Sequence, residues 1–253
     1  MDVLRDIWIV FQRYFRRAVT SPLQVTVSLV QPILYLLLFA PLLTSLPGLS
    51  GLAVRGSYQW FVPGLMILIA IFGVSSVGWS LISELRSGVL ERMWVTPVSR
   101  LGLLLGRVLR DVVTLVVQAV IIVAIAVPFG LKAKLPGLLV AFALVALLAL
   151  LMASVYYAGA LRVRSEESFG AIVFTAALPL LLLSGVLLPM SLAPRWLQGL
   201  AEVNPLLYAV DAERSLFAGT LANAAVAKGF AVIGGLAVVA LALAVREFRR
   251  AMI

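Results

Sequence analysis

Long runs without a charged residue constrain this chain more than any other feature of its sequence. The stretches from Asp111 to Lys132 and from Lys134 to Arg162 carry no charge between those residues. Each has room for the roughly 20 mostly apolar residues that a helix needs to cross a bilayer. Hydrophobic residues make up 63% of the chain and charged residues 12%, whereas a soluble domain carries roughly 25% charge. We therefore expect an integral membrane protein, because one aqueous core could not hold so many apolar side chains.

Uncharged runs recur along the whole chain and predict an all-α membrane protein, a single transmembrane domain covering 1–253. None of the expected spans contains an acidic or basic residue. Ion-coupled transporters usually need ionisable groups inside the membrane, so this pattern disfavours that class. The six expected spans are 25–43, 60–82, 112–131, 137–161, 169–188 and 229–245.

The excess of basic residues predicts how the chain is oriented. Lys and Arg number 20 against 11 Asp and Glu, which gives a net charge of +9. If the N-terminus is in the cytoplasm, 14 of the 20 basic residues lie in the segments on that side. Because Lys and Arg gather on the cytoplasmic side of membranes, both termini are expected there. Topology accounts for the positive charge, so we expect no nucleic-acid partner.

Residues 1–20 are expected to form an amphipathic helix, because their scattered charges leave no apolar run for a cleavable signal. Leu4, Ile7, Trp8 and Phe11 recur at helical spacing on one side. Such a helix is suited to lie at the cytoplasmic interface of the membrane, with its aromatic rings among the lipid headgroups. Packing of the same face against the spans is the alternative.

The residue types that are missing exclude several kinds of chemistry. The chain has no His and no Cys. This excludes Ser–His–Asp and Cys–His nucleophilic catalysis, zinc sites built from His or Cys, and disulfides. No phosphate-binding loop of the Gly-x-x-x-x-Gly-Lys-Ser/Thr type occurs either. Any energy source for transport must therefore come from another protein.

The connection 84–100 is rich in charge. Glu84 and Glu91 are seven residues apart, which places them on one face of a helix. Gly88 interrupts the helical continuation of the second span, and Pro97 ends a helix at the residue before it. We expect a short helix across the membrane face here. A solvated loop that only orients the bundle is the alternative.

Two further segments carry expectations. The amphipathic run 101–109 starts the next helix, with Arg107 and Arg110 expected on its polar side. The long external connection 189–227 is expected to form short helices that dip into the outer leaflet or cap the bundle. Irregular backbone at membrane depth is tolerated only where protein shields it or where it lines a water-filled cavity.

Several short motifs, taken together and in this order, resemble the membrane subunit of ABC-2-type exporters, among them the daunorubicin-resistance and nodulation-export permeases. The resemblance covers essentially the whole chain. It is carried by Gln31-Pro32, Phe61-Val-Pro-Gly-Leu65, Glu84 with Gly88-Val-Leu-Glu91-Arg92 and Thr96-Pro97-Val98-Ser99-Arg100, Ser184-Gly185 with Leu188-Pro189, and Asn204-Pro205-Leu206-Leu207-Tyr208-Ala209-Val210-Asp211.

The resemblance implies a coupling helix between spans two and three and short re-entrant helices between spans five and six. Two such subunits would pair, as a homodimer or with a sister permease, above two copies of an ABC nucleotide-binding subunit. ATP and Mg would be bound by that partner, so this chain is expected to hold no catalytic, cofactor or metal residues. Many relatives carry a second acidic residue after the first Glu, where this chain has Leu85 and Arg86. By position, the ATPase-coupling residues are Glu84, Gly88, Glu91, Arg92, Thr96 and Pro97.

The implied function is export of a hydrophobic or amphipathic cargo, such as a drug, a lipid or a glycolipid-like molecule. The cargo would leave the cytoplasm or inner leaflet across a bacterial inner membrane, by alternating access driven by the ATPase. Polar residues on the apolar spans are candidates for the substrate path, and a hydrogen bond between helices is the alternative for each. The candidates are Gln31, Tyr35, Ser75, Ser76, Gln118, Tyr156, Tyr157 and Thr175.

Two other functions are compatible with a charge-free bundle. A non-transporting scaffold or assembly factor for another complex would need only the spans and the charge bias. A membrane-embedded enzyme acting on lipids would need a cluster of ionisable residues at one membrane face. The best candidates for such a cluster lie in the external connection: Glu202, Asp211, Glu213 and Arg214.

Overall fold

The computed structural model describes residues 3–20, 29–38, 57–89, 99–187 and 189–251, and this part of the chain is almost entirely helical, without a strand. The main elements in chain order are α1 (Val3–Thr20), α4 (Ser57–Gly73), α5 (Ser76–Arg86), α7 (Arg100–Ala126), α8 (Leu135–Val163), α9 (Glu166–Leu183), the short 3-10 helix η1 (Met190–Leu192), α10 (Arg195–Glu202), α11 (Pro205–Phe217) and α12 (Ala224–Arg250).

Five stretches of the described chain are long and apolar enough to cross a membrane. The helices α4 and α5 together form one of them, Tyr58–Arg86, and α7, α8, α9 and α12 form the others. The first expected span, 25–43, lies mostly outside the described residues, and its described part is a short apolar helix, Leu29–Leu38. The all-α membrane fold expected from the sequence is confirmed, while the first span itself stays a prediction.

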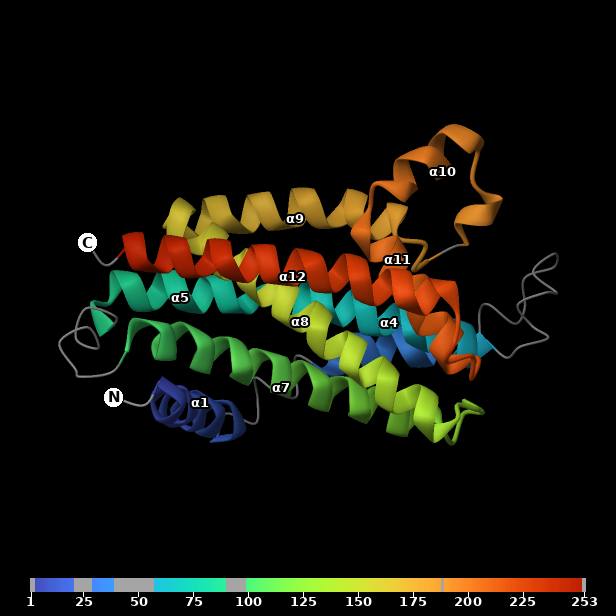
Figure 1. The fold of residues 1–253 in the computed structure, drawn as a ribbon, viewed down its shortest axis with the longest axis horizontal. Helices are drawn as coiled ribbons and strands as arrows, with labels where there is room; N and C mark the ends of the chain where they lie inside the picture. The colour runs from blue at the N-terminus through green and yellow to red at the C-terminus, as the bar shows by residue number, and fades with distance from the viewer. Residues whose placement is uncertain (1–2, 21–28, 39–56, 90–98, 188, 252–253) are drawn as a thin grey trace.

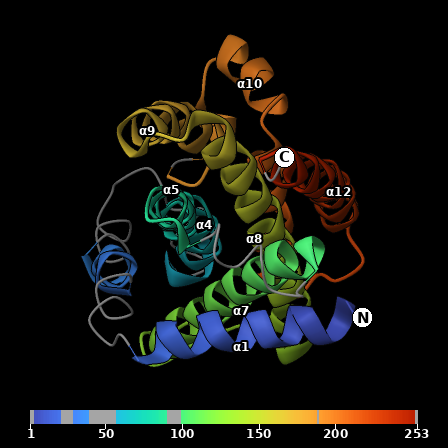
Figure 2. The same ribbon diagram turned by 90° about the vertical axis from the view of Figure 1, so that its left-hand side faces the viewer.

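Both chain termini lie at the same end of the bundle, while α10 stands at the opposite end (Figure 1). We call the first the terminal end; it includes Glu84, Arg107 and Glu247. We call the second the distal end; it includes Lys132 and α10. Figure 2, a view onto the terminal end, shows α1 running across this end beside α7.

The long helix α8 lies at the centre and packs against α12, α7, α5 and α11. Small side chains allow these helices to approach closely, as is usual where lipid supplies no hydrophobic drive for helices to associate. A Cβ atom added at Gly137 of α8 would lie 2.4 Å from the Leu216 carbonyl oxygen of α11, and one at Gly229 of α12 would lie 2.5 Å from Ala212 Cβ. Glycine is therefore required at both crossings.

The second span is broken between Gly73 and Ser76, where α4 ends and α5 begins. The Ser75 backbone N–H donates to the Phe72 carbonyl at 3.3 Å, and this shorter-range bond leaves the Ile71 carbonyl without its usual helical donor. The Tyr156 hydroxyl of α8 donates to that Ile71 oxygen at 2.7 Å. A side chain from a neighbouring span thus supplies the missing bond, as the absence of water in a bilayer core requires.

Short helices α10 and α11 fill the distal end, within the long connection for which short helices were expected. Asn204 begins α11: its side-chain oxygen accepts a hydrogen bond from the Leu206 N–H at 3.1 Å. The Asn204 amide nitrogen also donates to the Leu180 carbonyl at 2.7 Å, which holds this helix start against α9. Pro205 follows at the first helical position, where its fixed φ is suited to the helix.

Candidate functional site

Three helices meet at a buried charged group at the terminal end. The Arg107 guanidinium of α7 forms an ion pair with Glu84 of α5 and donates a hydrogen bond to the Tyr14 hydroxyl of α1. The Tyr14 hydroxyl in turn donates to Glu84 Oε2 at 3.0 Å, and the guanidinium carbon lies 4.6 Å from the centre of the Tyr14 ring. We call Tyr14, Glu84 and Arg107 the terminal-end charge network.

Arg107 was expected on the polar side of its helix, but the structure buries the residue, which is only 3% exposed. An isolated charge could not be buried at reasonable cost, and the partner that makes burial possible lies on another helix. Helical periodicity within 101–109 describes one helix by itself, so it carries no information about Glu84. One sequence signal pointed to buried charge on this helix: Arg110 and Asp111 directly precede an uncharged run.

A second buried group links α7 to α8 close by. Asp111 is 3% exposed, forms an ion pair with Arg110 at 2.8 Å, and accepts a hydrogen bond from the Tyr157 hydroxyl at 2.7 Å. The ion pair joins neighbouring residues of α7, so the contact between the two helices is the hydrogen bond from Tyr157 of α8, which is strengthened by the charge of its acceptor. The helices α1, α5, α7 and α8 are therefore tied together at the terminal end by polar contacts as well as by packing.

The first turn of α7 also holds α1 in place. Asp6 accepts a hydrogen bond from the Ser99 N–H at 2.8 Å, and the Ser99 hydroxyl oxygen accepts one from the Gly102 N–H at 3.0 Å, which caps α7. A Cβ atom at Gly102 would lie 2.7 Å from Asp6 Cβ, so a glycine is needed for α1 to dock here.

Burial raises the pKa of Tyr14 above its ordinary value, although the Arg107 charge opposes this. The Tyr14 phenol therefore remains protonated and can donate.

Two of the predicted coupling residues belong to this region. Glu84 is in the charge network, and Gly88 lies two residues after the end of α5 with a φ of 67°, a left-handed conformation that favours glycine. It ends the second span as the sequence predicted. The other four, Glu91, Arg92, Thr96 and Pro97, lie outside the described residues. Their part in coupling stays a prediction.

The candidate path residues divide into two groups. Ser75, Ser76 and Tyr156 lie at the break in the second span, and each makes a hydrogen bond to a backbone carbonyl of that span. Gln118 lies beside them, since a Cβ atom at Gly73 would be 3.5 Å from its side-chain oxygen. The structure does not bring the others to the break: Tyr157 bonds to Asp111, while Gln31, Tyr35 and Thr175 lie on the outer surface of the single chain.

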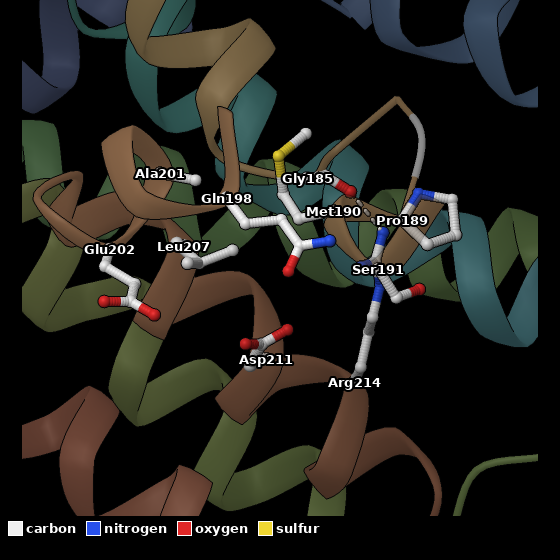
Figure 3. A pocket seen from close by; sticks show the side chains of 10 residues that line it. All are labelled: Gly185, Pro189, Met190, Ser191, Gln198, Ala201, Glu202, Leu207, Asp211 and Arg214. Carbon is white, nitrogen blue, oxygen red and sulfur yellow. Dashed lines mark hydrogen bonds between the residues drawn. The ribbon is translucent and has the colours of Figure 1, made fainter. Parts of the chain in front are cut away.

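The structure does not bring together all four ionisable residues that were candidates for a lipid-enzyme site. Glu202, Asp211 and Arg214 line one cavity at the distal end (Figure 3). Glu213 of the same helix does not line this cavity and is completely buried, with neither carboxyl oxygen hydrogen-bonded in the described structure. Within the described residues, no group of three or more acidic side chains could hold a metal ion.

The fold defines a multi-pass membrane protein: an apolar helical bundle with a crossing helix and a buried charge network at one end. The chain belongs to the ABC-2 type transporter family, whose model matches residues 5–218. A protein of Cyanophora paradoxa, whose name describes it as a transport permease (ycf38), is 27% identical over 216 residues, covering 85% of this chain and 74% of the relative.

Two bacterial relatives are named as ABC transporter permeases. The "Daunorubicin resistance ABC transporter permease protein DrrB1" of Streptomyces coeruleorubidus is 26% identical over 230 residues, covering 90% of this chain and 80% of the relative. The "Probable multidrug ABC transporter permease YbhR" of Escherichia coli is 27% identical over 182 residues, covering 68% of this chain and 49% of the relative. The resemblance inferred from the sequence motifs is thus confirmed at the level of the family.

Proposed function

We propose that this chain is the permease subunit of an ATP-driven exporter whose ATPase subunits dock at the terminal end. The observation that carries this proposal is the terminal-end charge network, which ties α1, α5 and α7 together directly beside the connection 84–100. Glu84 stands at the start of that connection and is bound to Arg107 on the helix that follows it. A displacement of the connection would therefore move several helices as one unit.

The coupling would act through discrete packings of the bundle. Removing one partner of a buried ion pair costs about 3–5 kcal/mol, so the tied helices resist independent movement. Two permease subunits, as a homodimer or with a sister permease, would sit above two ATPase subunits that alone bind ATP and Mg. Closure of the ATPases would shift the tied helices and open a path towards the distal end, a change between two packings of the kind common in transporters.

The cargo we propose is hydrophobic or amphipathic and moves out of the cytoplasm or the inner leaflet. Two relatives have names that refer to daunorubicin resistance and multidrug transport, which supports a drug-like cargo. The distribution of Lys and Arg supports a cytoplasmic position for the terminal end and both termini. The corresponding location is a bacterial inner membrane.

The test compares charge variants in liposomes that contain the permease with its cognate ATPase. We expect Glu84→Gln and Arg107→Met each to lower cargo-stimulated ATP hydrolysis by about fivefold or more, because the coupling between the two ends is weakened. The double variant should lose no more than either single one, since both changes break the same pair. Glu247→Gln is the matched control: among the described residues, the ion pairs of this terminal-end carboxylate with Arg162 and Arg250 are both long, at 3.8 Å.

Two outcomes would contradict the proposal. Normal coupling in both Glu84→Gln and Arg107→Met would remove the charge network from the mechanism, and normal assembly and coupling in Glu91→Lys would remove the connection 84–100 from the ATPase contact. A wild-type complex that assembles but never shows cargo-stimulated hydrolysis would favour the scaffold function instead.

A further inference from the structure

The helix α1 has three different faces at the terminal end, and one of them docks on α7. Val10 and Tyr14 are 3% and 5% exposed, and a Cβ atom added at Gly106 of α7 would lie 2.7 Å from Val10 Cβ. The helix crosses the end of the bundle, whereas the long helices run along its length (Figures 1 and 2). The other two faces of α1 are therefore directed away from α7.

The first of these outer faces is apolar. Leu4 is 80% exposed and Trp8 is 54% exposed, although both side chains are large and hydrophobic. The Trp8 ring stacks on Phe11 with centroids 5.3 Å apart, and Phe11 stacks on Phe15 at the same separation. A row of aromatic rings thus runs along the helix. Helices that lie in the membrane interface carry such rings at the depth of the lipid headgroups.

The second outer face is basic. Arg5, Arg13 and Arg16 are all exposed, and in a helix of 3.6 residues per turn their spacing places them on one side. None of the three forms an ion pair within 4 Å with another described residue. The acidic side chain of this helix, Asp6, accepts a hydrogen bond from the Ser99 N–H of the α7 cap instead. Within the described chain, three positive charges on this face are therefore left without a carboxylate.

We propose that the two outer faces of α1 bind the headgroups of anionic phospholipids in the adjacent leaflet. The Trp8 ring would lie at the headgroup boundary, and the guanidinium groups would donate paired hydrogen bonds to lipid phosphates. A zwitterionic lipid also has a phosphate, but its own positive group offsets the attraction to the basic face, so the anionic lipid is preferred. An acidic protein surface would match the arginines but would leave the exposed Leu4 and Trp8 unexplained.

The test measures which lipid gathers beside α1 in the full-length permease. Because the chain has no native cysteine, a bimane fluorophore can be attached at Gln12→Cys, an exposed position on α1. The permease is placed in phosphatidylcholine bilayers with a small, equal fraction of either phosphatidylglycerol or phosphatidylcholine that carries a nitroxide near its headgroup as a short-range quencher. We expect phosphatidylglycerol to be enriched at least about threefold beside α1, and less at high salt. Ser168→Cys, an exposed position at the start of α9, should show no enrichment.

Charge variants assign the enrichment to the basic face. The triple variant Arg5→Gln/Arg13→Gln/Arg16→Gln should abolish it, because no positive charge remains there to attract the anionic headgroup. The triple variant with lysine at the same three positions should keep most of the enrichment, because it keeps the charge. Persistence of the enrichment in the glutamine variant would overturn the proposal.

The matched control removes three exposed positive charges from the same end of the molecule, by glutamine at Arg162, Arg249 and Arg250. It should leave the enrichment beside α1 unchanged. An equal loss in this control, or equal quenching by the two lipids at Gln12→Cys, would overturn the proposal. A glutamine variant of α1 that keeps the enrichment but no longer retains the ATPase would assign the basic face to a protein partner and overturn it as well. The quenching measurement needs no ATPase, so its result is independent of the coupling test.

Discussion

At the scale of single residues, burial of charge has two different outcomes in this protein. Arg107 is buried with an acidic partner and a tyrosine hydroxyl, so its charge is compensated. Glu213 is buried without any hydrogen-bond partner for either oxygen among the described residues. An unpartnered buried polar group costs about 1–3 kcal/mol. Arg107 therefore holds its neighbours in place, whereas Glu213 lowers the stability of the folded chain.

Replacing Glu213 with leucine should stabilise the chain. The substitution removes a buried carboxyl group without a partner, so we expect an increase in the free energy of unfolding of about 1–3 kcal/mol. Thermal unfolding of the purified permease in detergent would show this as a higher midpoint. Glu167→Leu, at an exposed position on another helix, should change the midpoint little. A lower midpoint for Glu213→Leu would show that the carboxyl group has a stabilising partner.

Glu213 should also make the stability of the folded chain depend on pH. Burial raises the pKa of Glu213, which lies in the non-spanning helix α11, well above its ordinary value of 4.5. The folded chain therefore holds a proton that the unfolded chain releases, and this contribution is complete below pH 4.5 and is lost as the pH rises through the raised pKa. The unfolding midpoint of the wild type should fall more between pH 5 and pH 9 than that of Glu213→Gln. Parallel curves would contradict this.

At the scale of helices, close crossings at glycine determine which elements pack together. A Cβ atom at Gly78 of α5 would lie 2.2 Å from the ring of Phe169 on α9, and that ring is itself buried. The same ring makes an edge-on contact with Trp79 of α5, and the Trp79 indole N–H donates to the Glu166 carbonyl at 3.1 Å. The contact between α5 and α9 therefore depends on the missing side chain at Gly78.

An alanine at Gly78 should separate α5 from α9. We expect Gly78→Ala to lower the free energy of unfolding by about 1–3 kcal/mol, the usual effect of overpacking a close contact. Gly235→Ala in α12 is the matched control, because no atom lies within 4 Å of the added Cβ, and alanine is a better helix former than glycine. Its unfolding midpoint should stay the same or rise. Equal effects of the two substitutions would show that α5 and α9 do not pack as described.

At the scale of the whole molecule, the two ends of the bundle differ in chemistry. The terminal end carries the buried charge network and the crossing helix α1, and the distal end carries the short helices α10 and α11 and the cavity lined by Glu202, Asp211 and Arg214. This difference matches the proposed division of labour between an end that contacts the ATPase and an end that faces outwards. The proposed orientation can be tested on the chain directly, because it contains no native cysteine.

Single cysteines should report the orientation without background. Ser87→Cys at the terminal end should react with a membrane-impermeant maleimide only after the cells are permeabilised, because the proposed orientation, based on the distribution of Lys and Arg, puts that end in the cytoplasm. Ala222→Cys at the distal end should react in intact cells. Both positions are exposed in the structure. The reverse labelling pattern would invert the topology and with it the proposed side of ATPase docking.

The sequence by itself determined the class of fold, the family and most of the spans. The reason is physical: a bilayer requires long apolar helices that satisfy their own backbone, and such helices are visible as uncharged runs. Gly88 could be predicted as a helix end because its effect is local. The motif at 84–100 predicted Glu84 as a coupling residue, a role that stays a prediction, and it carried no information about the partner of Glu84.

The tertiary structure decided how the polar residues are used. The pairs of Glu84 with Arg107, Asp111 with Tyr157, and Ile71 with Tyr156 join residues on different helices. No periodicity within one helix records which neighbour it will meet, so Arg107 was expected on a polar side, whereas the structure buries it. The cavity at the distal end also exists only where η1, α10 and α11 come together. Length and polarity along the chain select the spans, whereas packing between distant segments selects the partners.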